Sequence, residues 1–295
     1  MPRPQLTAIL ELLKPVTWFP PMWAFGCGVV SAGTLSASRW PVIVTGVILA
    51  GPLVCATSQA VNDWFDRHVD AINEPQRPIP SGRMPGTWGL HIAMIWTALS
   101  VVVAATLGTY VLLAAIMGLV LAWAYSAPPW RLKLNGWWGN AACAACYEGL
   151  AWLTGAMVAS GGMTTDWRTI ALAGLYSFGA HGIMTLNDFK SIEGDRLMGI
   201  GSLPVRLGAA NAGLVACFFM AGSQVAVIGL LWAWGRLPHA IAIAVLLTVQ
   251  VVLMKRLLAD PRERAPWYNA TGVSLYVIGM LISAFAIQPS TAGLS

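Results

Sequence analysis

Three aspartates, Asp63, Asp66 and Asp70, lie within one short polar stretch of the chain. On an α-helix their spacing places all three carboxylates on one face. Like charges on one face repel one another, so the arrangement needs a cation between them. Ligands made only of oxygen select a hard cation such as Mg²⁺ or Ca²⁺ over zinc. Asn62 adds a neutral oxygen one turn before Asp66, so the stretch predicts a divalent-metal site.

A related pattern recurs later in the chain, where an Asn-Asp pair ending at Asp188 is followed by Asp195. The middle position holds Ser191 instead of an aspartate. Glu193 lies between them; on a regular helix it points away from the face of Asp195, but Gly194 could break the helix and bring it back. A single acidic run is usually a solvated helix face. Two copies, each at the end of a long apolar segment, favour two metal-binding clusters instead.

The composition indicates where such clusters must sit. The chain of 295 residues is 57% hydrophobic and 10% charged, with a mean hydropathy of +0.67. Soluble domains carry about 25% charged residues, so this is predicted to be an all-α polytopic membrane protein. No polar stretch is long enough for a separate domain, and we expect one unit over residues 1–295. Residues 1–14 lack the pattern of a cleaved signal peptide.

The apolar stretches predict nine transmembrane helices in a bundle around a central cavity, because each needs about 20 residues to span a bilayer. A very short turn near Gly108 joins the third and fourth into a hairpin. The predicted spans cover 16–36, 41–62, 88–108, 110–126, 138–160, 168–187, 210–234, 238–256 and 268–288.

The basic residues predict the orientation of this bundle. Most of the 17 Lys and Arg fall in the connections on one side, and the other side holds only Arg39, Arg168 and Arg236. The positive-inside rule places the richer side in the cytoplasm. We therefore expect the N-terminus, the cap loops and both acidic motifs on the cytoplasmic side of a bacterial inner or intracytoplasmic membrane, and the C-terminus opposite.

Several basic residues accompany the acidic motifs. Mg²⁺ keeps coordination positions open for phosphate oxygens, and Arg binds such oxygens in pairs. A ligand with a phosphate or diphosphate head and an apolar tail, such as a polyprenyl diphosphate, matches this rim and the apolar helices beside it. Each basic residue could instead set the orientation of the protein in the membrane or contact anionic lipid head groups. The candidate diphosphate contacts are Arg77, Arg131, Lys133 and Lys190.

The motif Asn62-Asp63-x-x-Asp66-x-x-x-Asp70 resembles the first signature of the UbiA superfamily of intramembrane prenyltransferases. Quinone, haem O and archaeal lipid prenyltransferases share that signature. Two further stretches, residues 72–82 and residues 187–205 with Glu-Gly-Asp-Arg and Ser-Leu-Pro-Val, resemble the chlorophyll and bacteriochlorophyll synthase branch. Many superfamily members carry Asp at the position of Ser191, whereas this branch tends towards Ser.

The resemblance implies that the propionate of bacteriochlorophyllide a or chlorophyllide a is esterified with geranylgeranyl or phytyl diphosphate. Diphosphate is then released, in the last step of (bacterio)chlorophyll biosynthesis. The bacteriochlorophyll enzyme is favoured, but the sequence leaves the ring, the tail, the oligomeric state and any pigment-biosynthesis partner proteins open. One Mg²⁺ is expected at the first motif and a second at the other. The expected catalytic and metal-binding residues are Asn62, Asp63, Asp66, Asp70, Asp188 and Asp195.

Two lone polar residues inside predicted spans are candidates for an acceptor pocket. Glu148 is an intramembrane acid, which marks a functional site by default, although it could bond a neighbouring helix. His181 lies seven residues before Asp188 and could be an axial ligand of the chlorin magnesium or a hydrogen-bonded interior residue. Two other functions stay open. One is a prenyltransferase with a quinone or lipid acceptor; the other is a transporter of an anionic solute, although transporters place charges at the midplane.

Overall fold

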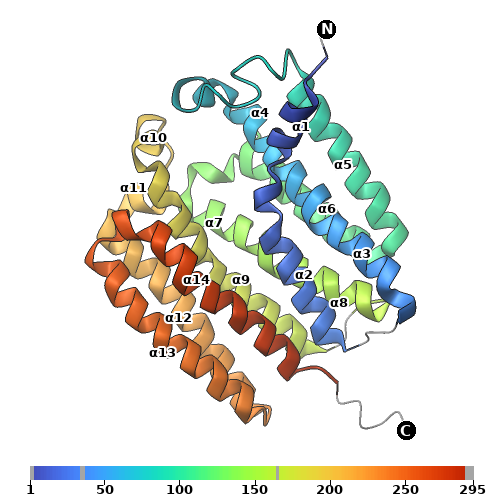
Figure 1. Cartoon of the computed structure of the whole chain (residues 1–295), viewed down its shortest axis with the longest axis vertical. Helices are drawn as coiled ribbons and strands as arrows, with labels where there is room; N and C mark the ends of the chain where they lie inside the picture. The colour runs from blue at the N-terminus through green and yellow to red at the C-terminus, as the bar shows by residue number, and fades with distance from the viewer. Residues whose placement is uncertain (1–2, 34–36, 164–165, 290–295) are drawn as a thin grey trace.

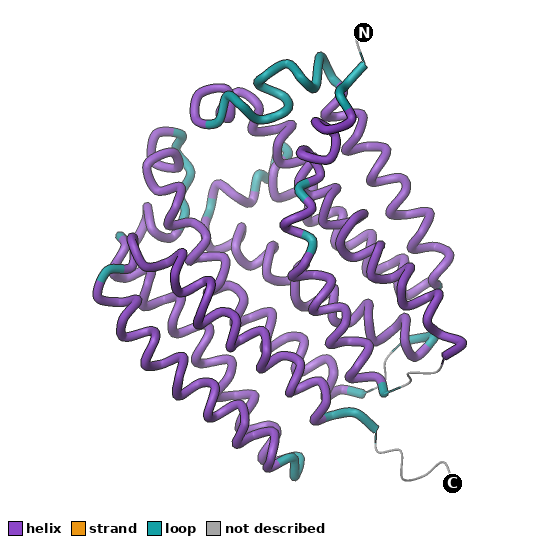
Figure 2. Tube along the Cα trace, viewed as in Figure 1, coloured by secondary structure: helices purple, strands orange, loops and turns teal. Residues whose placement is uncertain are grey.

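The computed structural model describes residues 3–33, 37–163 and 166–289, and this part of the chain is helical without strands. Figure 2 shows helices joined by short loops, with longer loops gathered near the N-terminus. The helices are α1 (Leu6–Leu13), α2 (Phe19–Ala32), α3 (Trp40–Ile48), α4 (Ala56–Asn73), α5 (Trp88–Leu107), α6 (Thr109–Ser126), α7 (Gly136–Ala144), α8 (Ala151–Ser160), α9 (Trp167–Asn187), α10 (Ile192–Leu197), α11 (Leu203–Leu207), α12 (Ala209–Ala233), α13 (Leu237–Ala259) and α14 (Pro261–Ala286).

Two long helices contain π-helical segments. Leu49–Cys55 joins α3 to α4, and Ala145–Leu150 joins α7 to α8. Pro52 lies in the first of these segments and cannot donate a backbone hydrogen bond. Such one-turn widenings change the direction of side chains and occur frequently at functional sites.

Eight helices in the described residues are long and apolar enough to span a membrane, so the nine predicted spans are not all confirmed. The exception is the first. The helix α2 has 14 residues, which at 1.5 Å per residue is about 21 Å, short of the roughly 30 Å of a hydrocarbon core. The other predicted spans correspond to observed helices, and α14 begins at Pro261, earlier than expected.

The bundle has two sides that meet at α2, α7 and α8. The helices α4, α5 and α6 pack together on one side, and α9, α12, α13 and α14 pack on the other (Figure 1). Between them, α2 lies closely against α8. A Cβ atom on Gly155 of α8 would come within 2.8 Å of the carbonyl carbon of Phe25. Glycine therefore permits the close backbone contact that small residues provide between membrane helices.

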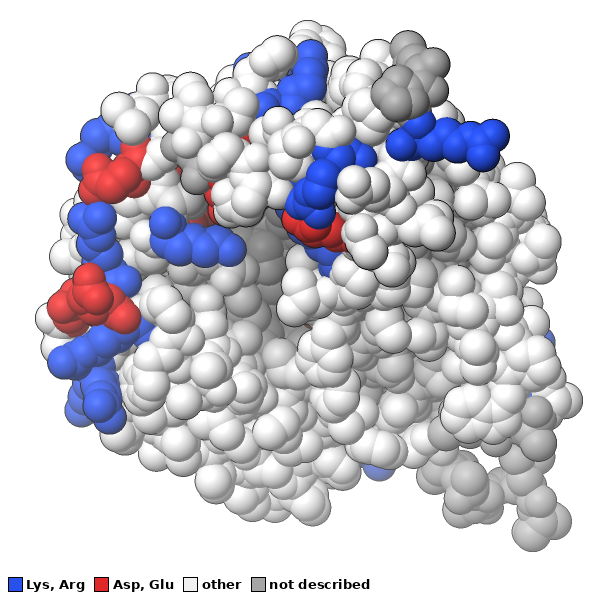
Figure 3. Space-filling model, turned by 45° about the horizontal axis from the view of Figure 1, so that its top comes forward, with Lys and Arg blue, Asp and Glu red and all other residues white. Residues whose placement is uncertain are grey.

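The long connections gather at one end of the bundle. The helices α4, α6, α9 and α13 all end there, and α1 lies at the same end (Figure 1). Seen from this direction, basic and acidic side chains surround a hollow in the surface (Figure 3). The loops after α4 and α6 and the segment of α10 and α11 form the rim of this end. The fold thus brings both acidic motifs to one end, as the sequence predicts.

Candidate active site

The first acidic motif lies on the last turns of α4 and is paired with basic groups. Asp63 is buried, with 2% of its surface exposed. Its Oδ1 accepts a hydrogen bond from Lys14 Nζ at 2.6 Å and from an Arg77 nitrogen at 3.3 Å. Arg77 also donates to Asp70 Oδ2 at 3.0 Å and pairs with Glu74. One guanidinium therefore bridges two carboxylates of the motif.

Charge and burial act in opposite directions on Arg77. Burial favours the neutral form of its guanidinium, but the charges of Asp63, Asp70 and Glu74 outweigh that effect and raise the pKa of Arg77. The side chain therefore stays cationic. It can neutralise carboxylates when no ligand is present and phosphate oxygens when one is.

Asp66, the middle aspartate of the motif, contacts two residues from different parts of the chain. Its Oδ1 accepts a hydrogen bond from Lys133 Nζ, and its Oδ2 accepts one from Asn62 Nδ2 at 2.9 Å. Lys133 is buried in the loop between α6 and α7. Burial lowers the pKa of Lys133, and the charge of Asp66 opposes this effect. The charge of Arg131, which adopts a left-handed backbone with φ of 39°, also acts on Lys133.

The second motif is built on an interrupted helix. The helix α9 ends at Asn187, and a 3-10 turn, Asp188–Ser191, precedes α10. Asp188 Oδ2 accepts a hydrogen bond from Asn140 Nδ2 at 3.1 Å. Asp195 interacts electrostatically with Asp188 and with Asp66 of the first motif. The two motifs therefore face one another, which sequence spacing alone could not establish.

Glu193 lies outside this arrangement, because α10 continues through Gly194 as a helix. Its carboxylate is exposed and pairs with Arg262 of α14 at 2.9 Å. A second, longer contact joins it to Arg196 at 3.8 Å.

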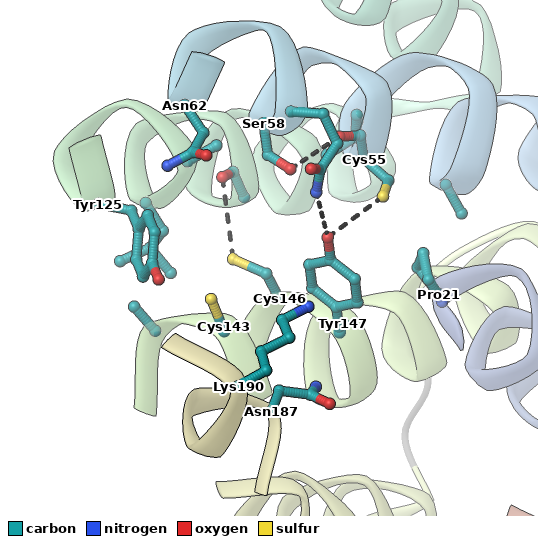
Figure 4. A pocket seen from close by; sticks show the side chains of 17 residues that line it. Pro21, Cys55, Ser58, Asn62, Tyr125, Cys143, Cys146, Tyr147, Asn187 and Lys190 are labelled. Atoms are coloured by element: carbon teal, nitrogen blue, oxygen red, sulfur yellow. Dashed lines mark hydrogen bonds between the residues drawn. The ribbon is translucent and has the colours of Figure 1, made fainter. Parts of the chain in front are cut away.

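A cavity of about 300 Å³ lies between α4, α6 and α7, next to both motifs (Figure 4). Its polar end contains Asn62, Asn187 and Lys190, and the Lys190 side chain extends towards Tyr147. The hydroxyl of Tyr147 accepts a hydrogen bond from Gln59 Nε2 at 2.9 Å. The opposite end is apolar and continues into a narrow space between the helices. The residues shared by the cavity and this space are Pro21, Ala50, Val54, Gly118 and Cys146.

A second cavity of about 590 Å³ lies beside the first, between α2, α9, α14 and the π-helical segment Ala145–Leu150. The two share Cys143, Tyr147 and Asn187 in their walls. Glu148 lines the second cavity, as predicted for an acceptor pocket.

His181, the other residue predicted for that pocket, lines neither of these two cavities. Its ring stacks on Phe219 at 4.3 Å between centroids. Its Nε2 lies 3.2 Å from the carbonyl oxygen of Trp137. These contacts favour the hydrogen-bonded interior alternative, and its role towards the acceptor stays a prediction.

The sequence did not single out Lys14, Asn140 or Tyr147. Lys14 ends α1 in a left-handed conformation with φ of 46°, and this places its ammonium against Asp63. Asn140 holds Asp188, and Tyr147 separates the cavities. A lysine in a loop is common and gives no signal, whereas a polar residue inside a membrane helix, such as Asn140, could have drawn attention.

The oxygen atoms present suit Mg²⁺ bound together with a phosphorylated substrate. No group of three or more His, Cys, Asp or Glu side chains in the described ranges is placed to hold a metal ion by itself. Mg²⁺ commonly uses only one or two carboxylates, with water and substrate phosphates completing its shell. Within the described residues, Asp63 Oδ2 is buried without a hydrogen-bond partner. The donor set therefore fits an ion that substrate helps to hold.

Fold and site together define an integral membrane protein of the α-helical class, with charged groups at one end of an internal cavity. The profile of the UbiA prenyltransferase family matches residues 18–278. The chain therefore belongs to the UbiA prenyltransferase family and is an enzyme.

Relatives with a named activity match almost the whole chain. The Bacteriochlorophyll synthase 33 kDa chain of Cereibacter sphaeroides is 55% identical over 285 residues, covering 97% of this chain and 94% of that protein. The chloroplastic chlorophyll synthase of Oryza sativa is 38% identical over 290 residues, covering 94% of this chain and 76% of that one.

Solved structures share the fold. A UbiA homolog from Archaeoglobus fulgidus, bound to GPP and Mg²⁺, superposes with a TM-score of 0.74 at 21% identity. The alignment covers 95% of this chain and 99% of the archaeal chain. At this identity the likeness establishes the architecture only.

Proposed function

We propose that the protein esterifies the propionate of bacteriochlorophyllide a or chlorophyllide a with geranylgeranyl or phytyl diphosphate. Diphosphate is released, and the reaction completes (bacterio)chlorophyll biosynthesis. The main support is that the two acidic motifs, whose Asp66 and Asp195 interact electrostatically, lie beside one cavity with an apolar end. The identity to bacteriochlorophyll synthase over nearly the whole chain narrows the acceptor to a tetrapyrrole.

The donor occupies the first cavity in this proposal. Its diphosphate lies at the polar end near Asn62 and Lys190, and its prenyl chain extends towards Ala50 and Val54. Apolar walls favour such a chain through the hydrophobic effect. The positive charges of Arg77, Arg131, Lys133 and Lys190, joined by Lys14, surround the head group.

Two Mg²⁺ ions are proposed, one held by Asn62, Asp63, Asp66 and Asp70 and the other by Asp188 and Asp195. The related archaeal fold was solved with GPP and Mg²⁺, which is consistent with this. When bound, Mg²⁺ acts as a Lewis acid on the diphosphate oxygens. Lys14, Arg77 and Lys133 hydrogen-bond to the carboxylates of the first motif.

The basic side chains stabilise the negative charge that builds up on the departing diphosphate. The carbon that loses diphosphate becomes cationic and is captured by the acceptor carboxylate. That carboxylate is ionised at neutral pH, so this reaction needs no general base. Water would compete for the same carbon and must be excluded. The apolar walls and the rim loops serve that purpose.

The orientation remains part of the proposal. The short 3-10 turn Pro15–Thr17 leads directly into α2. Together with this turn, α2 is proposed as the ninth crossing, which places the ends of α1 and α14 on opposite sides. The rim with its excess of basic residues then faces the cytoplasm by the positive-inside rule. Residues 1–295 form one domain in a bacterial inner or intracytoplasmic membrane.

An esterification assay tests the proposal. Purified protein receives bacteriochlorophyllide a or chlorophyllide a, geranylgeranyl or phytyl diphosphate, and either Mg²⁺ or EDTA. We expect an esterified pigment that forms with Mg²⁺ and not with EDTA, and the preferred ring and tail identify the physiological substrates. Folded protein that binds prenyl diphosphate but esterifies neither pigment would exclude a tetrapyrrole acceptor. Failure to bind any prenyl diphosphate would contradict the donor site itself.

A further inference from the structure

The second cavity contains a buried acid that the transfer chemistry does not use. Glu148 is 4% exposed, and its Oε2 has no hydrogen-bond partner in the described part of the chain. It lies in the π-helical segment Ala145–Leu150, which lines the cavity. An acid with an unpaired oxygen that lines a cavity indicates a ligand with a matching group.

No described residue supplies a positive charge next to Glu148. The ionisable groups that interact with it are Cys27 of α2 and Tyr276 of α14, neither of which is a cation. Among the described residues no Lys, Arg or His charge acts on it. Transferring a lone carboxylate from water to such a place is unfavourable unless a counter-charge is supplied. A ligand with a positive centre would offset this cost.

Much of the remaining cavity wall is apolar and suits a large apolar ring system. Phe19 and Trp23 contribute aromatic surface from α2, and Val273 and Val277 contribute aliphatic surface from α14. The indole nitrogen of Trp23 donates to the carbonyl oxygen of Val277 at 3.0 Å. Its polar atom is therefore satisfied, and the ring offers only apolar contact to a ligand. Phe19 and Ile278 are exposed, so the cavity reaches the molecular surface.

The position of the cavity fits the acceptor rather than the donor. Tyr147 and Asn187 belong to both cavity walls. A ring held in the second cavity can therefore direct a short side chain towards the first, where the diphosphate end of the donor is proposed to lie.

We propose, resting on the proposed function, that the second cavity binds the magnesium tetrapyrrole ring of the acceptor and that the Glu148 carboxylate coordinates its central magnesium. The four ring nitrogens leave an axial position open on that ion, and magnesium favours oxygen ligands. The ligand thus supplies the positive centre that the protein does not. Glu148 is a binding residue in this role and takes no part in breaking the donor bond.

Pigment binding without any prenyl diphosphate tests this assignment directly. Bacteriochlorophyllide a and its magnesium-free counterpart are titrated against wild-type protein, Glu148→Ala and Glu148→Gln. The visible absorption of the magnesium pigment is recorded, because its Qx band reports the coordination number of the metal. Glu263→Gln is the matched control, since Glu263 is exposed and outside the cavity lining.

Wild-type protein and Glu263→Gln should bind the magnesium pigment about tenfold more tightly than the metal-free one, a difference of about 1.4 kcal/mol. Glu148→Ala should bind both pigments equally and shift the Qx band. Glu148→Gln keeps the shape of the side chain and weakens the preference, because its amide oxygen carries no charge. Unchanged binding of geranylgeranyl diphosphate shows that the variants are folded.

A preference for the magnesium pigment that persists in Glu148→Ala and Glu148→Gln, with the same Qx band as wild type, would overturn the coordination. The coordination would also be overturned if wild-type protein that esterifies bacteriochlorophyllide a bound this pigment and its magnesium-free counterpart equally well. A wild-type protein that esterifies neither pigment in the assay above contradicts the proposed function instead. The two failures are therefore distinguishable.

Discussion

The two acidic motifs have similar sequences but different environments. The first lies on the continuous helix α4 and is neutralised by basic side chains from α1, from its own loop and from the loop before α7. The second is divided between a 3-10 turn and α10, and its Asp188 is held by the neutral amide of Asn140. The carboxylates of the first motif are therefore paired with cations, whereas Asp188 of the second motif is hydrogen-bonded to a neutral side chain.

We propose that this difference gives the two motifs distinct tasks. In the proposed function the basic residues around the first motif would bind diphosphate and its carboxylates would bind Mg²⁺. The second motif, with fewer basic contacts, depends on geometry fixed by an amide. The following substitutions test this comparison, beginning with the largest expected effect.

Removing an aspartate from either motif should have the largest effect. We expect Asp66→Ala and Asp195→Ala each to lower kcat by roughly a thousandfold, since each deletes a charge that stabilises the transition state. Turnover of pigment in detergent is the measurement. Asp166→Ala is the control, because Asp166 pairs with Arg168 at the opposite end of the bundle. Near-normal turnover in either motif variant would show that the motifs do not hold the catalytic metals.

Substitution of Lys133 should cause the second largest loss of activity. Lys133→Met keeps the length of the side chain but removes the charge beside Asp66, and we expect kcat to fall by about a hundredfold. Steady-state kinetics at varied prenyl diphosphate separates this loss from weaker donor binding. Lys255→Met serves as the comparison, since Lys255 lies exposed on α13. Equal activity of both variants would remove Lys133 from the site.

Asn140 tests the second motif. Asn140→Leu is close in volume but cannot donate to Asp188, and we expect about a tenfold loss of Mg²⁺ affinity, as for residues that orient metal ligands. The Mg²⁺ concentration needed for half-maximal activity is the readout. A variant with lower kcat but an unchanged Mg²⁺ requirement would indicate that the amide has another role.

Lys14 should have the smallest effect of the substituted residues, because it is partly exposed and Arg77 also contacts Asp63. Lys14→Ala should lower kcat/KM for the donor by about threefold to tenfold, within the range of a partly solvated charge pair. Lys14→Arg should retain most activity. A loss as large as that of Lys133→Met would mean that the α1 contact is as important as the buried one.

The order of these effects is itself informative. If Lys133 and Lys14 rank as expected, burial decides how much each cation contributes. If Asn140→Leu reduces activity more than Lys133→Met, the second motif limits the reaction. The pairing of charges at the first motif then contributes little to catalysis.

Much of this architecture follows from the sequence alone. A bilayer has no water to satisfy backbone groups, so long apolar stretches form helices, and most of their bounds agree with the structure. The spacing of Asp63, Asp66 and Asp70 predicts a common face, and α4 continues without a break through all three. The alternation of basic connections also agrees with helix ends gathered at one side of the bundle.

Only the tertiary structure revealed the partners of these residues and the shape of the cavities. Lys14, Asn140 and Lys133 come from three separate segments, and their contacts depend on how helices pack, which local patterns do not encode. The helix α2 is short because the chain turns at Lys14 and forms a 3-10 turn at Pro15–Thr17 before α2 begins. This turn is difficult to predict from the sequence. Glu148 Oε2 likewise lacks a partner within the described residues because neither α2 nor α14 places a hydrogen-bond donor next to it. Local sequence sets helix formation and membrane burial, whereas charge pairing and cavities are properties of the assembled bundle.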